Sequence, residues 1–585
     1  MDAVIREAPI GQIIRYLTNN KYLQYPEEKP GFQLPETWVQ MLHSLDGAKN
    51  GSEKPADREH QSFDRSESSS NRDTEISRTP TLNAEDRLEA NAIELEKVQS
   101  IPVAPRKTRD GTILVDWYYT DDVENPHNWG NVKRALITSI ICLYTFVVYM
   151  TSSIYTSSEQ DIMEIFHVGE VVVSLGLALY VLAYGLGPLF FSPLGEIPVI
   201  GRNPVYIVTM FLFVIISIPT ALVNNFPGLL VLRFLQGFFG SPCLASGGAS
   251  IGDMYSLNAL PYAMMAWVSA AYCGPALAPL LSGFAVPVEN WHWSLYESVW
   301  ASAPVFIVML LFLPETSTPT ILLRRAHRLR KIYNTDRFMS QSEIDQRNLK
   351  VSEVAIDALL KPMEITIKDP AVLFVQVYTA IIYGIYYSFF EVFPLVYPVD
   401  YGMSLGQVGL VFLCILVACI LGILSYMSYL YFYQGPRIAK FGFPVHEDRL
   451  IPALPAAVGP TVGLFLFAWT ANASIHWIVP TIGITIYGGT VFVVMQCLFV
   501  YIPLSYPKYA ASLFAANDFF RSALACGSIL FAHPLFGNLG VARGTSVLGG
   551  LSVIGIVGIW LLYIYGARLR SLSKFAESEE PTFEQ

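Results

Sequence analysis

The sequence predicts an all-α membrane protein with twelve transmembrane helices arranged as two pseudo-symmetric six-helix bundles. The chain has 585 residues, of which 52% are hydrophobic and only 15% charged, with a mean hydropathy of +0.40. This composition is far from that of a soluble domain. Apolar runs of about 20 residues, the length that crosses a bilayer, recur from 135 to 567. A long charged segment near the middle divides these runs into six and six.

Each expected span is an apolar run with very few charges, such as ALITSIICLYTFVVYMTSSIY at 135–155. Runs of this length and composition predict helices that cross a membrane and not helices buried in a soluble core. We expect spans at 135–155, 171–193, 204–223, 228–250, 261–285, 295–313, 371–394, 408–431, 450–470, 475–502, 509–534 and 545–567.

Positive charges at the ends of the spans predict the orientation. One set of connections holds nearly all of the flanking cations: Lys133, Arg134, Arg202, Arg437, Lys440, Arg449, Lys508, Arg568, Arg570, Lys574 and LLRRAHRLRK at 322–331. The opposite loops carry only Arg543. Because Lys and Arg are retained on the cytoplasmic side, we expect both termini in the cytoplasm. The basic central connection is then a topology signal, and we expect no nucleic-acid partner.

These boundaries define five expected regions. They are a cytoplasmic N-terminal region at 1–133, a first bundle at 134–313, a basic cytoplasmic loop at 314–370, a second bundle at 371–567 and a cytoplasmic tail at 568–585.

The N-terminal region is strongly polar in its second half. Residues 51–100 hold 12 Asp and Glu against 7 Lys and Arg, with few apolar side chains, so we expect disorder at 45–100. This segment supplies half of the net charge of −10, and the acidity therefore describes a tail and not an acidic partner. Apolar residues at 10–17 have near-helical spacing, which fits either an amphipathic helix or a weakly ordered tail.

Several classes of protein are disfavoured. All seven cysteines fall inside expected spans, which argues against a disulfide framework, and no Cys/His pair has the spacing of a metal site. The nine histidines are scattered without a His-Glu-x-x-His string, so we expect no enzyme. A Walker A string is also missing. We therefore expect no metal or cofactor, and an ion gradient as the energy source.

The two halves of the sequence share a similar turn after their second span. SPLGEIPVIGRNPVYI (192–207) follows the second span, and YQGPRIAKFGFPVHEDRLIPA (433–453) follows the eighth. Both are short turns with Gly, Pro, an acid and an arginine. Two related six-helix bundles are typical of secondary transporters, whose halves rock around a site near the midplane.

Arg233 is the most costly residue of the predicted spans. A cation at a helix centre costs roughly 2.5–3.5 kcal/mol, so such residues usually face the bundle interior and are functional. In LRFLQGFFGSP (232–242), Gln236 lies on the same helical face three residues later. The alternative is an arginine near a helix end whose head reaches the lipid headgroups.

The fifth span contains YCGPALAPLLSGF (272–284). Pro275 and Pro279 remove backbone hydrogen bonds and are expected to bend the helix. Gly274, Ala278 and Ser282 form a stripe of small residues that lets another helix approach closely. Taken alone, the stretch also fits a purely structural kink.

Two further groups lie in the second half. Tyr383, Tyr386, Tyr387 and Phe390 recur at three and four residues in span seven, which fits either an interfacial aromatic band or the lining of a substrate cavity, followed by Glu391. Glu391 then either binds a cation or proton, or is an interfacial carboxylate. In span eleven, Asp518 and Arg521 are three apart and positioned to pair.

Three strings resemble signatures of the major facilitator superfamily. LRFLQGFF resembles its Arg-x-x-Gln-Gly element in helix four, and Gly274-Pro275 resembles the antiporter signature Gly-Pro-x-x-Gly, with Ala278 in place of the second glycine. The turn from Glu196 to Gly201 and Arg202 resembles Gly-x-Leu-x-Asp-x-x-Gly-Arg, with Glu for Asp and two extra residues. The resemblance implies a conformational role for this turn.

Other strings resemble one fungal branch, the twelve-span drug:proton antiporters of the benomyl and multidrug resistance type. They are KYLQYPEEKPGFQLPETW (21–38), NPHNWGNVKR (125–134), LPETSTPTILLRRAHRLRK (313–331), FEVFPLVY (390–397) and AANDFFRS (515–522). The resemblance implies proton-coupled export of bulky amphiphilic molecules such as antifungal drugs, fungicides or toxins. It also implies a monomer in the plasma membrane whose partners are these molecules, protons and lipid.

In this scheme Arg233, beside Gln236, tunes a nearby carboxylate. A guanidinium does not release its proton at accessible pH, so the proton carrier is another group, with Glu391 and Asp518 as candidates. The alternatives are an exporter of one self-made metabolite, a polyamine or nutrient transporter, and a transporter-like receptor. Asn472 begins the glycosylation sequon Asn-Ala-Ser in a predicted outer loop.

Overall fold

The computed structural model describes residues 2–42, 100–103, 105–108, 112–256, 258–346, 351–441, 446–506 and 510–573. The expected disorder at 45–100 falls outside the described residues except for Ser100, as does the tail beyond residue 573. The chain forms two compact units. The first contains 1–23, 129–317 and 351–585, and the second contains 24–128 and 318–350.

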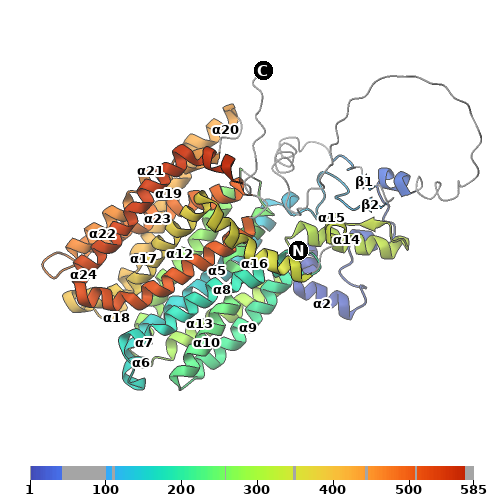
Figure 1. The fold of residues 1–585 in the computed structure, drawn as a ribbon. Coiled ribbons are helices and arrows are strands. Elements are labelled where there is room, and N and C mark those ends of the chain that lie inside the picture. Colours follow the sequence, from blue (N-terminus) through green and yellow to red (C-terminus); the bar gives the residue numbers. More distant parts are fainter. Residues whose placement is uncertain are drawn as a thin grey trace, which may run out of the picture. The chain divides into compact units, whose positions relative to one another are not determined.

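The first unit is built from helices (Figure 1). Its elements are α1 (Asp2–Glu7), α2 (Pro9–Leu17), α5 (Asn131–Ser153), η3 (Ile154–Ser158), α6 (Glu159–Phe166), α7 (Glu170–Val173), α8 (Leu175–Glu196), α9 (Arg202–Leu222), α10 (Phe226–Gly240), α11 (Pro242–Gly252), α12 (Leu260–Ala285), α13 (Trp293–Phe312), α16 (Val351–Lys368), α17 (Pro370–Tyr401), α18 (Leu405–Val411), α19 (Leu413–Tyr429), the π-helical η4 (Leu430–Gln434), α20 (Gly435–Phe441), η5 (His446–Leu450), α21 (Ala453–Ala456), α22 (Gly459–Thr470), α23 (Ile478–Ser505) and α24 (Ala510–Leu572).

Eleven helices of the described chain are long and apolar enough to cross a membrane. They match the twelve predicted spans because the last one, Ser512–Ser571, covers two of them. Gly540 interrupts it with φ +75°, a backbone conformation that favours glycine. Both ends of α24 approach the same end of α23: the rings of Phe499 and Phe514 are 5.6 Å apart, and Gly566 lies beside Tyr501. The chain therefore turns back within α24.

Local signals in the sequence explain several helix starts. Asn225 accepts a hydrogen bond from the amide of Gly228 at the start of α10 (2.7 Å), and Asp369 accepts one from Ala371 at the start of α17 (3.0 Å). Such N-caps satisfy amides that have no partner inside the helix. Span seven is longer than predicted because α17 continues through two prolines to Tyr401. A proline is tolerated within a membrane helix when neighbours satisfy the freed carbonyl.

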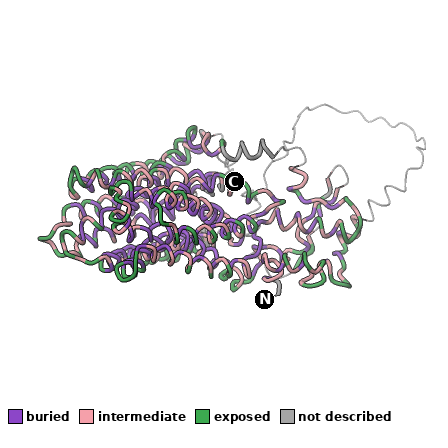
Figure 2. The backbone as a smooth tube through the Cα atoms, turned by 90° about the horizontal axis from the view of Figure 1, so that it is seen from below, coloured by how far each residue is buried: buried purple, intermediate pink, exposed green. Residues whose placement is uncertain are grey.

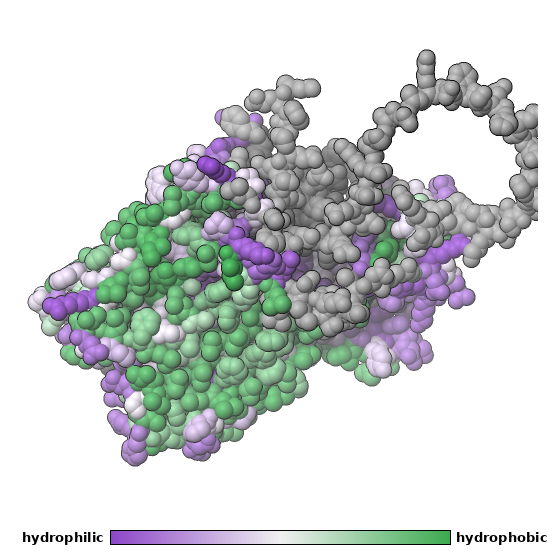
Figure 3. Space-filling model, in the orientation of Figure 1, coloured by the Kyte–Doolittle hydropathy of each residue, from purple (hydrophilic) through white to green (hydrophobic). Residues whose placement is uncertain are grey.

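The outer surface of these helices is apolar. Figure 3 shows hydrophobic side chains covering the face of the spanning helices, with polar residues gathered toward the ends. Large exposed side chains include Val231, Trp300, Leu424 and Tyr565. Burial follows the inward sides of the helices (Figure 2). An exposed apolar surface of this extent matches a hydrocarbon solvent.

The first half (α5–α13) and the second half (α17–α24) contact each other directly. α8 packs against α24, and α12 against α18. Gly283 of α12 approaches the backbone of Leu405, where a Cβ on the glycine would lie 3.0 Å from the carbonyl oxygen. The inner end of the helical bundle is defined as the end at which α5 and α17 begin, which is cytoplasmic in the predicted orientation. The opposite end is the outer end.

The N-terminal segment 9–17 forms α2, so of the two alternatives for this segment the structure has the helix. Tyr16 and Leu17 are 84% and 73% exposed. Lys133, at the start of α5, pairs with Glu7 of α1 at 3.1 Å. The N-terminal helices are thereby tied to the first bundle.

The second unit joins two distant parts of the sequence. It contains η1 (Pro26–Glu28), β1 (Arg106–Lys107), β2 (Ile113–Leu114), η2 (Pro126–Asn128), α14 (Thr318–Tyr333), β3 (Phe338–Met339) and α15 (Gln341–Gln346). The sheet order is β1-β2-β3, with β1 antiparallel and β3 parallel to β2. Its apolar core includes Trp38, Ile113, Tyr118, Leu329 and Phe338.

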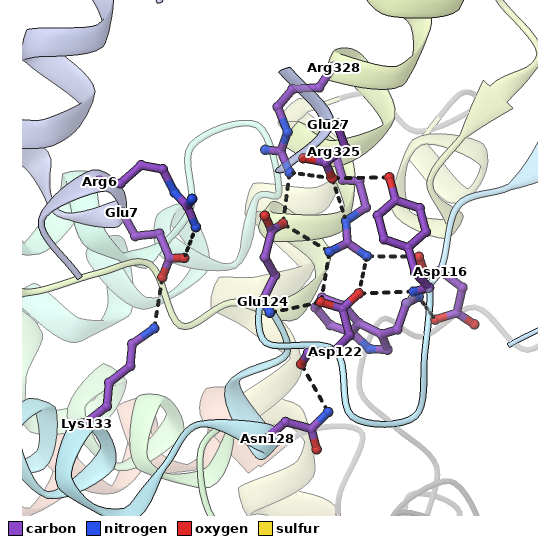
Figure 4. A network of polar contacts seen from close by, with 12 residues as sticks. Arg6, Glu7, Glu27, Asp116, Asp122, Glu124, Asn128, Lys133, Arg325 and Arg328 are labelled. Carbon is purple, nitrogen blue, oxygen red and sulfur yellow. Dashed lines mark hydrogen bonds and ion pairs between the residues drawn. The ribbon is translucent and has the colours of Figure 1, made fainter. Parts of the chain in front are cut away.

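The basic string of α14 has a structural role that the sequence analysis missed. Arg325 is 1% exposed and pairs with Asp122 (2.7 Å) and Glu124 (3.1 Å). Arg328 pairs with Glu124 (2.9 Å) and Glu27 (3.4 Å). Figure 4 shows both guanidinium groups directed at these three carboxylates. The prediction that the cations of 322–331 serve as a topology signal is therefore incomplete, because two of them, Arg325 and Arg328, also form buried ion pairs.

Electrostatics in this cluster follow from burial and pairing. Burial opposes ionisation of Asp122, but the Arg325 guanidinium and its hydrogen bonds outweigh it and lower the pKa of Asp122 below its usual value. Burial also opposes the charge of Arg325, and Glu124 and Asp122 outweigh it and raise the pKa of Arg325. Asp122 and Arg325 therefore stay ionised at neutral pH.

Candidate functional site

Arg233 lies in α10 with no exposed surface. Its Nε donates to the carbonyl of Gly176 (3.2 Å), and its two Nη atoms donate to the carbonyls of Thr151 (2.9 Å) and Ser152 (2.7 Å). Nη1 also donates to Oε1 of Gln236 (3.3 Å). The side chain therefore does not extend to the headgroups, and the alternative of a snorkelling arginine is wrong.

Aromatic rings complete the surroundings of Arg233. The guanidinium carbon lies 4.5 Å from the ring centroid of Tyr180 and 5.2 Å from that of Tyr155. Gln236 in turn donates to Ser217 Oγ at 2.7 Å. Among the described residues, the hydrogen-bond acceptors of Arg233 are carbonyl and amide oxygens and no carboxylate. This fixed cation joins the outer part of α5 to α8 and α10.

The Gly-Pro string lies where α12 crosses α5. A Cβ on Gly274 would lie 2.7 Å from the carbonyl oxygen of Phe146, so only glycine permits this approach. The carbonyl of Pro275 accepts a hydrogen bond from Ser153 Oγ at 3.0 Å. This bond satisfies a carbonyl that Pro279, four residues later, cannot bind because proline has no N–H. Ala278 is fully buried against Met150. α12 continues unbroken through Pro279.

The turn between α8 and α9 is at the inner end. α8 ends at Glu196, Gly201 has φ +81°, and Arg202 pairs with Asp253. Glu315, which the sequence analysis did not single out, accepts hydrogen bonds from the amides of Arg202 (3.3 Å) and Asn203 (3.2 Å). An anion at a helix N-terminus is stabilised by the unpaired amides and the dipole. The turn is therefore held to the end of α13.

The aromatic stripe of α17 is buried between the halves. Tyr383, Tyr386, Tyr387 and Phe390 are 8%, 4%, 0% and 1% exposed, so they do not form an interfacial band. Tyr387 hydrogen-bonds Ser152 (3.1 Å) and Tyr184 (3.1 Å), both in the first half. Tyr184 also bonds to Tyr383.

Further contacts cross between the halves beside these tyrosines. Tyr386 donates to the carbonyl of Tyr272 at 3.3 Å. Arg521 pairs with Asp518 and donates to the hydroxyl of Tyr149 in α5 (3.1 Å), with its guanidinium 4.5 Å from the ring of Tyr383. We call this set the tyrosine centre: Tyr149, Ser152, Tyr184, Tyr383, Tyr387, Asp518 and Arg521. It places aromatic rings, hydroxyls and a paired acid in the buried contact between the halves.

Glu391 is 1% exposed, and the alternative of a wet interfacial carboxylate is wrong. Because α17 continues for ten residues beyond it, Glu391 lies inside the helix and not at its end. Its Oε2 is 2.7 Å from His533 Nε2 and accepts a hydrogen bond from Ser174 Oγ at 3.4 Å. Sequence reasoning missed His533, because a lone histidine in the apolar string ILFAHPLF carries no spacing signal.

Other polar groups of the interior also went unnoticed. Asn517, next to Asp518, donates to Gln376 Oε1 and Thr379 Oγ1, both at 2.7 Å. Gln496 of α23 is fully buried, and neither atom of its amide has a hydrogen-bond partner among the residues that the structure describes. Polar side chains spaced along apolar spans were a usable signal here, since each is costly in lipid.

The sequon residue Asn472 lies between α22 and α23, where its Oδ1 accepts a hydrogen bond from the amide of Ser474 at 3.1 Å. In the described ranges, no group of three or more His, Cys, Asp and Glu side chains is placed to hold a metal ion.

Comparison with known proteins adds the family. The model described as Major Facilitator Superfamily matches residues 141–529. The MFS-type transporter pyvG of Aspergillus violaceofuscus is 42% identical, covering 98% of this chain and 100% of that protein. Fluconazole resistance protein 1 of Saccharomyces cerevisiae is 40% identical, covering 79% and 85%. Cycloheximide resistance protein of Candida maltosa is 34% identical, covering 98% and 100%.

Solved structures agree on the fold. The proton:xylose symporter XylE superposes with a TM-score of 0.53 at 13% identity, covering 75% of this chain and 96% of that one. The peptide transporter POT gives 0.52 at 14%, covering 77% and 98%. Two helical halves packed around a polar centre and a family model that matches two thirds of the sequence lead to one conclusion: the chain belongs to the major facilitator superfamily and is a multi-pass membrane protein.

Proposed function

We propose that this chain exports bulky amphiphilic small molecules, such as antifungal drugs, fungicides or toxins, in exchange for protons. Relatives named for resistance to fluconazole and cycloheximide, and as a multidrug transporter, support drug efflux. The observation that carries the proposal is the tyrosine centre, in which tilted aromatic rings and hydroxyls from both halves lie beside a buried acid–arginine pair. Such a surface suits flat, apolar and cationic molecules.

The transport cycle follows from where the contacts lie. The halves rock about a site near the midplane, and the hydrogen bonds between Tyr387, Ser152 and Tyr184 form and break as they do so. The exported molecule enters from the cytoplasm or inner leaflet. Its rings stack on the tyrosines that the halves present to each other.

Arg233 acts as a fixed positive charge in this cycle. Four of its five N–H donors bind Gly176, Thr151, Ser152 and Gln236. A guanidinium does not release its proton at accessible pH. It therefore sets the potential for nearby carboxylates, of which Glu391 and Asp518 are the candidates to carry the proton.

The protein acts as a monomeric carrier and not as an enzyme, in the plasma membrane with both termini in the cytoplasm. The cations of the inner end, among them Lys133, Arg202 and Arg570, support this orientation.

Export of one self-made metabolite is the second candidate. The citrinin biosynthesis cluster MFS transporter mrr1 of Monascus ruber is 33% identical over 83% of this chain. A deletion strain that becomes sensitive to a single compound, and not to several unrelated inhibitors, would favour this candidate. Uptake of polyamines or nutrients into energised cells, or binding without any transport, would favour an importer or a receptor.

Efflux of a fluorescent amphiphile from drug-sensitive yeast that produces the chain tests the proposal. A protonophore should stop efflux while ATP is maintained, and continued efflux would refute proton coupling.

In the same assay Arg233→Ala should lower efflux about tenfold or more at equal surface amount, because one orphaned buried carbonyl already costs about 1–3 kcal/mol. The matched control Arg543→Ala removes an exposed arginine and should leave efflux unchanged. Equal efflux by both variants would refute the role given to Arg233.

A further inference from the structure

The outer end contains a polar contact between the halves that is centred on His533. Glu391 of α17 and His533 of α24 belong to the second half, and Glu170 and Ser174 to the first. His533 Nε2 is 2.7 Å from Glu391 Oε2, and its Nδ1 is 3.4 Å from Glu170 Oε2. Ser174 Oγ donates to Glu391 at 3.4 Å. One imidazole therefore connects acids from opposite halves.

The two acids differ in their contact with water. Glu391 has a side chain 1% exposed, whereas the side chain of Glu170 is 65% exposed and that of His533 is 16% exposed. A route for a proton thus leads from an exposed carboxylate through an imidazole to a buried carboxylate. Histidine is suited to this task because its charge changes near physiological pH.

The buried carboxylate is under-satisfied. Within the described part of the chain, Glu391 Oε1 is buried and has no hydrogen-bond partner. An ionised carboxylate in such a place is costly unless a cation pairs with it or a proton neutralises it. One proton shared by Glu391 and His533 meets this requirement wherever it resides. On His533 it makes an imidazolium that pairs with the carboxylate, and on Glu391 it makes a neutral carboxylic acid beside a neutral imidazole.

The charged and titratable groups that face this pair come from every surrounding element. They are Glu170 of α7, Tyr155 of η3, Glu159 of α6 and Arg233 of α10, in addition to Glu391 and His533 themselves. Glu159 is within electrostatic reach of both Glu391 and Arg233. Tyr155 is likewise within electrostatic reach of both Glu391 and Arg233, so the fixed charge of Arg233 is linked to this pair through Glu159 and Tyr155.

From this geometry we infer that Glu391 and His533 together bind one proton from the outer solution and thereby close the outer end of the transporter. With the proton bound, the pair is neutral overall and stays buried against Ser174 and Glu170. Without it, Glu391 is an uncompensated buried anion, and separation of the halves returns it to water. The assignment to a transport cycle rests on the proposed function, and it selects Glu391 over Asp518 as the site of the outer proton.

Asp518 is in a different situation. Its Oδ1 pairs with Arg521 on the same helix, which in turn donates to Tyr149. The guanidinium opposes the effect of burial on this carboxylate and gives Asp518 a permanent cationic partner, whereas the described partner of Glu391 is a titratable imidazole. Asp518 is therefore better placed to hold Arg521 in the tyrosine centre than to accept a proton.

The first test uses the purified full chain without any drug, so that it does not depend on transport. Infrared difference spectra are recorded while the pH is lowered, in the carboxylic-acid C=O region for Glu391 and in the ring-mode region for His533. The unchanged chain should show a protonation change that Glu391→Gln and His533→Gln each remove or displace, and Asp518→Asn keeps. A change that is lost only in Asp518→Asn would overturn the inference.

The second test uses inside-out vesicles, in which the lumen corresponds to the outer side. Drug accumulation is measured while the luminal pH is varied at constant external pH. For the unchanged chain we expect up to about tenfold change in rate per pH unit across the titration. Glu391→Gln, which keeps the shape and a hydrogen bond to His533, should flatten this profile to less than about twofold.

The matched control in both tests is Glu164→Gln, which removes an exposed carboxylate from α6 at the same end and should keep the full pH profile. A luminal-pH profile that Glu391→Gln and His533→Gln leave unchanged would overturn the inference. A chain that gives the expected infrared change but exports no drug would refute the proposed function alone.

Discussion

Replacing Arg325 by alanine should selectively loosen the second unit. The side chain is 1% exposed and pairs with Asp122, Glu124 and, through Nε at 3.4 Å, Glu27. Removing one partner of a buried ion pair costs about 3–5 kcal/mol, because the remaining charges stay buried. Arg328 still pairs with two of the three carboxylates. We therefore expect the lower end of this range, about 3 kcal/mol.

Hydrogen–deuterium exchange of the full chain in detergent measures this loss locally. The amide of Ile113 donates across the sheet to the carbonyl of Arg337 at 2.8 Å, which makes it a suitable reporter. A loss of 3 kcal/mol corresponds to roughly one hundredfold faster exchange, at about 1.4 kcal/mol per factor of ten. Amides in the middle of α17 should not change.

The pH dependence of this loss has a definite sign. The pKa of Asp122 is lowered in the folded chain, because the Arg325 contacts outweigh its burial. Its pairing therefore stabilises the unit above the unfolded pKa, near 3.9, and this contribution disappears as the pH falls through the lower folded value. The difference between the unchanged chain and Arg325→Ala should be full at neutral pH and shrink in acid.

Arg330 provides the matched control. Its side chain is 15% exposed and pairs with Glu343, which is 27% exposed, and such a solvated pair contributes about 0–1 kcal/mol. If Arg330→Ala accelerated exchange at Ile113 as strongly as Arg325→Ala, or if neither changed it, the reasoning from burial would be refuted.

Three further outcomes are expected. Gly274→Ala places a Cβ 2.7 Å from the Phe146 carbonyl oxygen and should lower the free energy of unfolding by roughly 1–3 kcal/mol. The control Gly527→Ala places a Cβ where the described chain has no atom within 4 Å and should leave the stability unchanged. Equal melting temperatures of the two variants would contradict the close approach of α5 and α12. Glu315→Ala removes the acceptor of two amides at the start of α9 and should cost roughly 1–2 kcal/mol. Amide exchange at the start of α9 should become faster. Asn472→Gln should remove a glycan, seen as a mobility shift with glycosidase-treated chain as the reference; unchanged mobility would show that the sequon is not used.

The spans and their number were predictable because the signal is local. A helix that satisfies its own backbone in lipid needs about 20 apolar residues and nothing from the rest of the chain. The last two spans were predicted separately because Asn538 and Arg543 interrupt the apolar run between them, and in the structure the chain turns back at Gly540 within this stretch. The length of α17 was underestimated because its two prolines suggest an end that neighbouring helices prevent.

Contacts between distant segments were not predictable. His533 gains its partner only because α24 packs against α17 and α7, and nothing in the string AHPLF indicates an acid beside it. Likewise, Glu27, Asp122 and Arg325 are separated by up to about three hundred residues and meet only when the second unit folds. The family motifs pointed to Arg233, but they did not indicate that four oxygens from α5, α8 and α10 accept its hydrogen bonds.

The sequence by itself determined that this is a twelve-span helical membrane protein of two related halves, because apolar length, flanking charge and short motifs act along the chain. Tertiary structure alone decided which polar groups contact each other. Arg233 binds backbone carbonyls, Arg521 binds Tyr149, and Glu391 lies against His533. It also decided that the basic loop folds into one unit with part of the N-terminal segment. The physical reason is the cost of a buried charge. A charge in the interior must find a partner within a few ångströms, and that partner is set by helix packing and not by sequence distance.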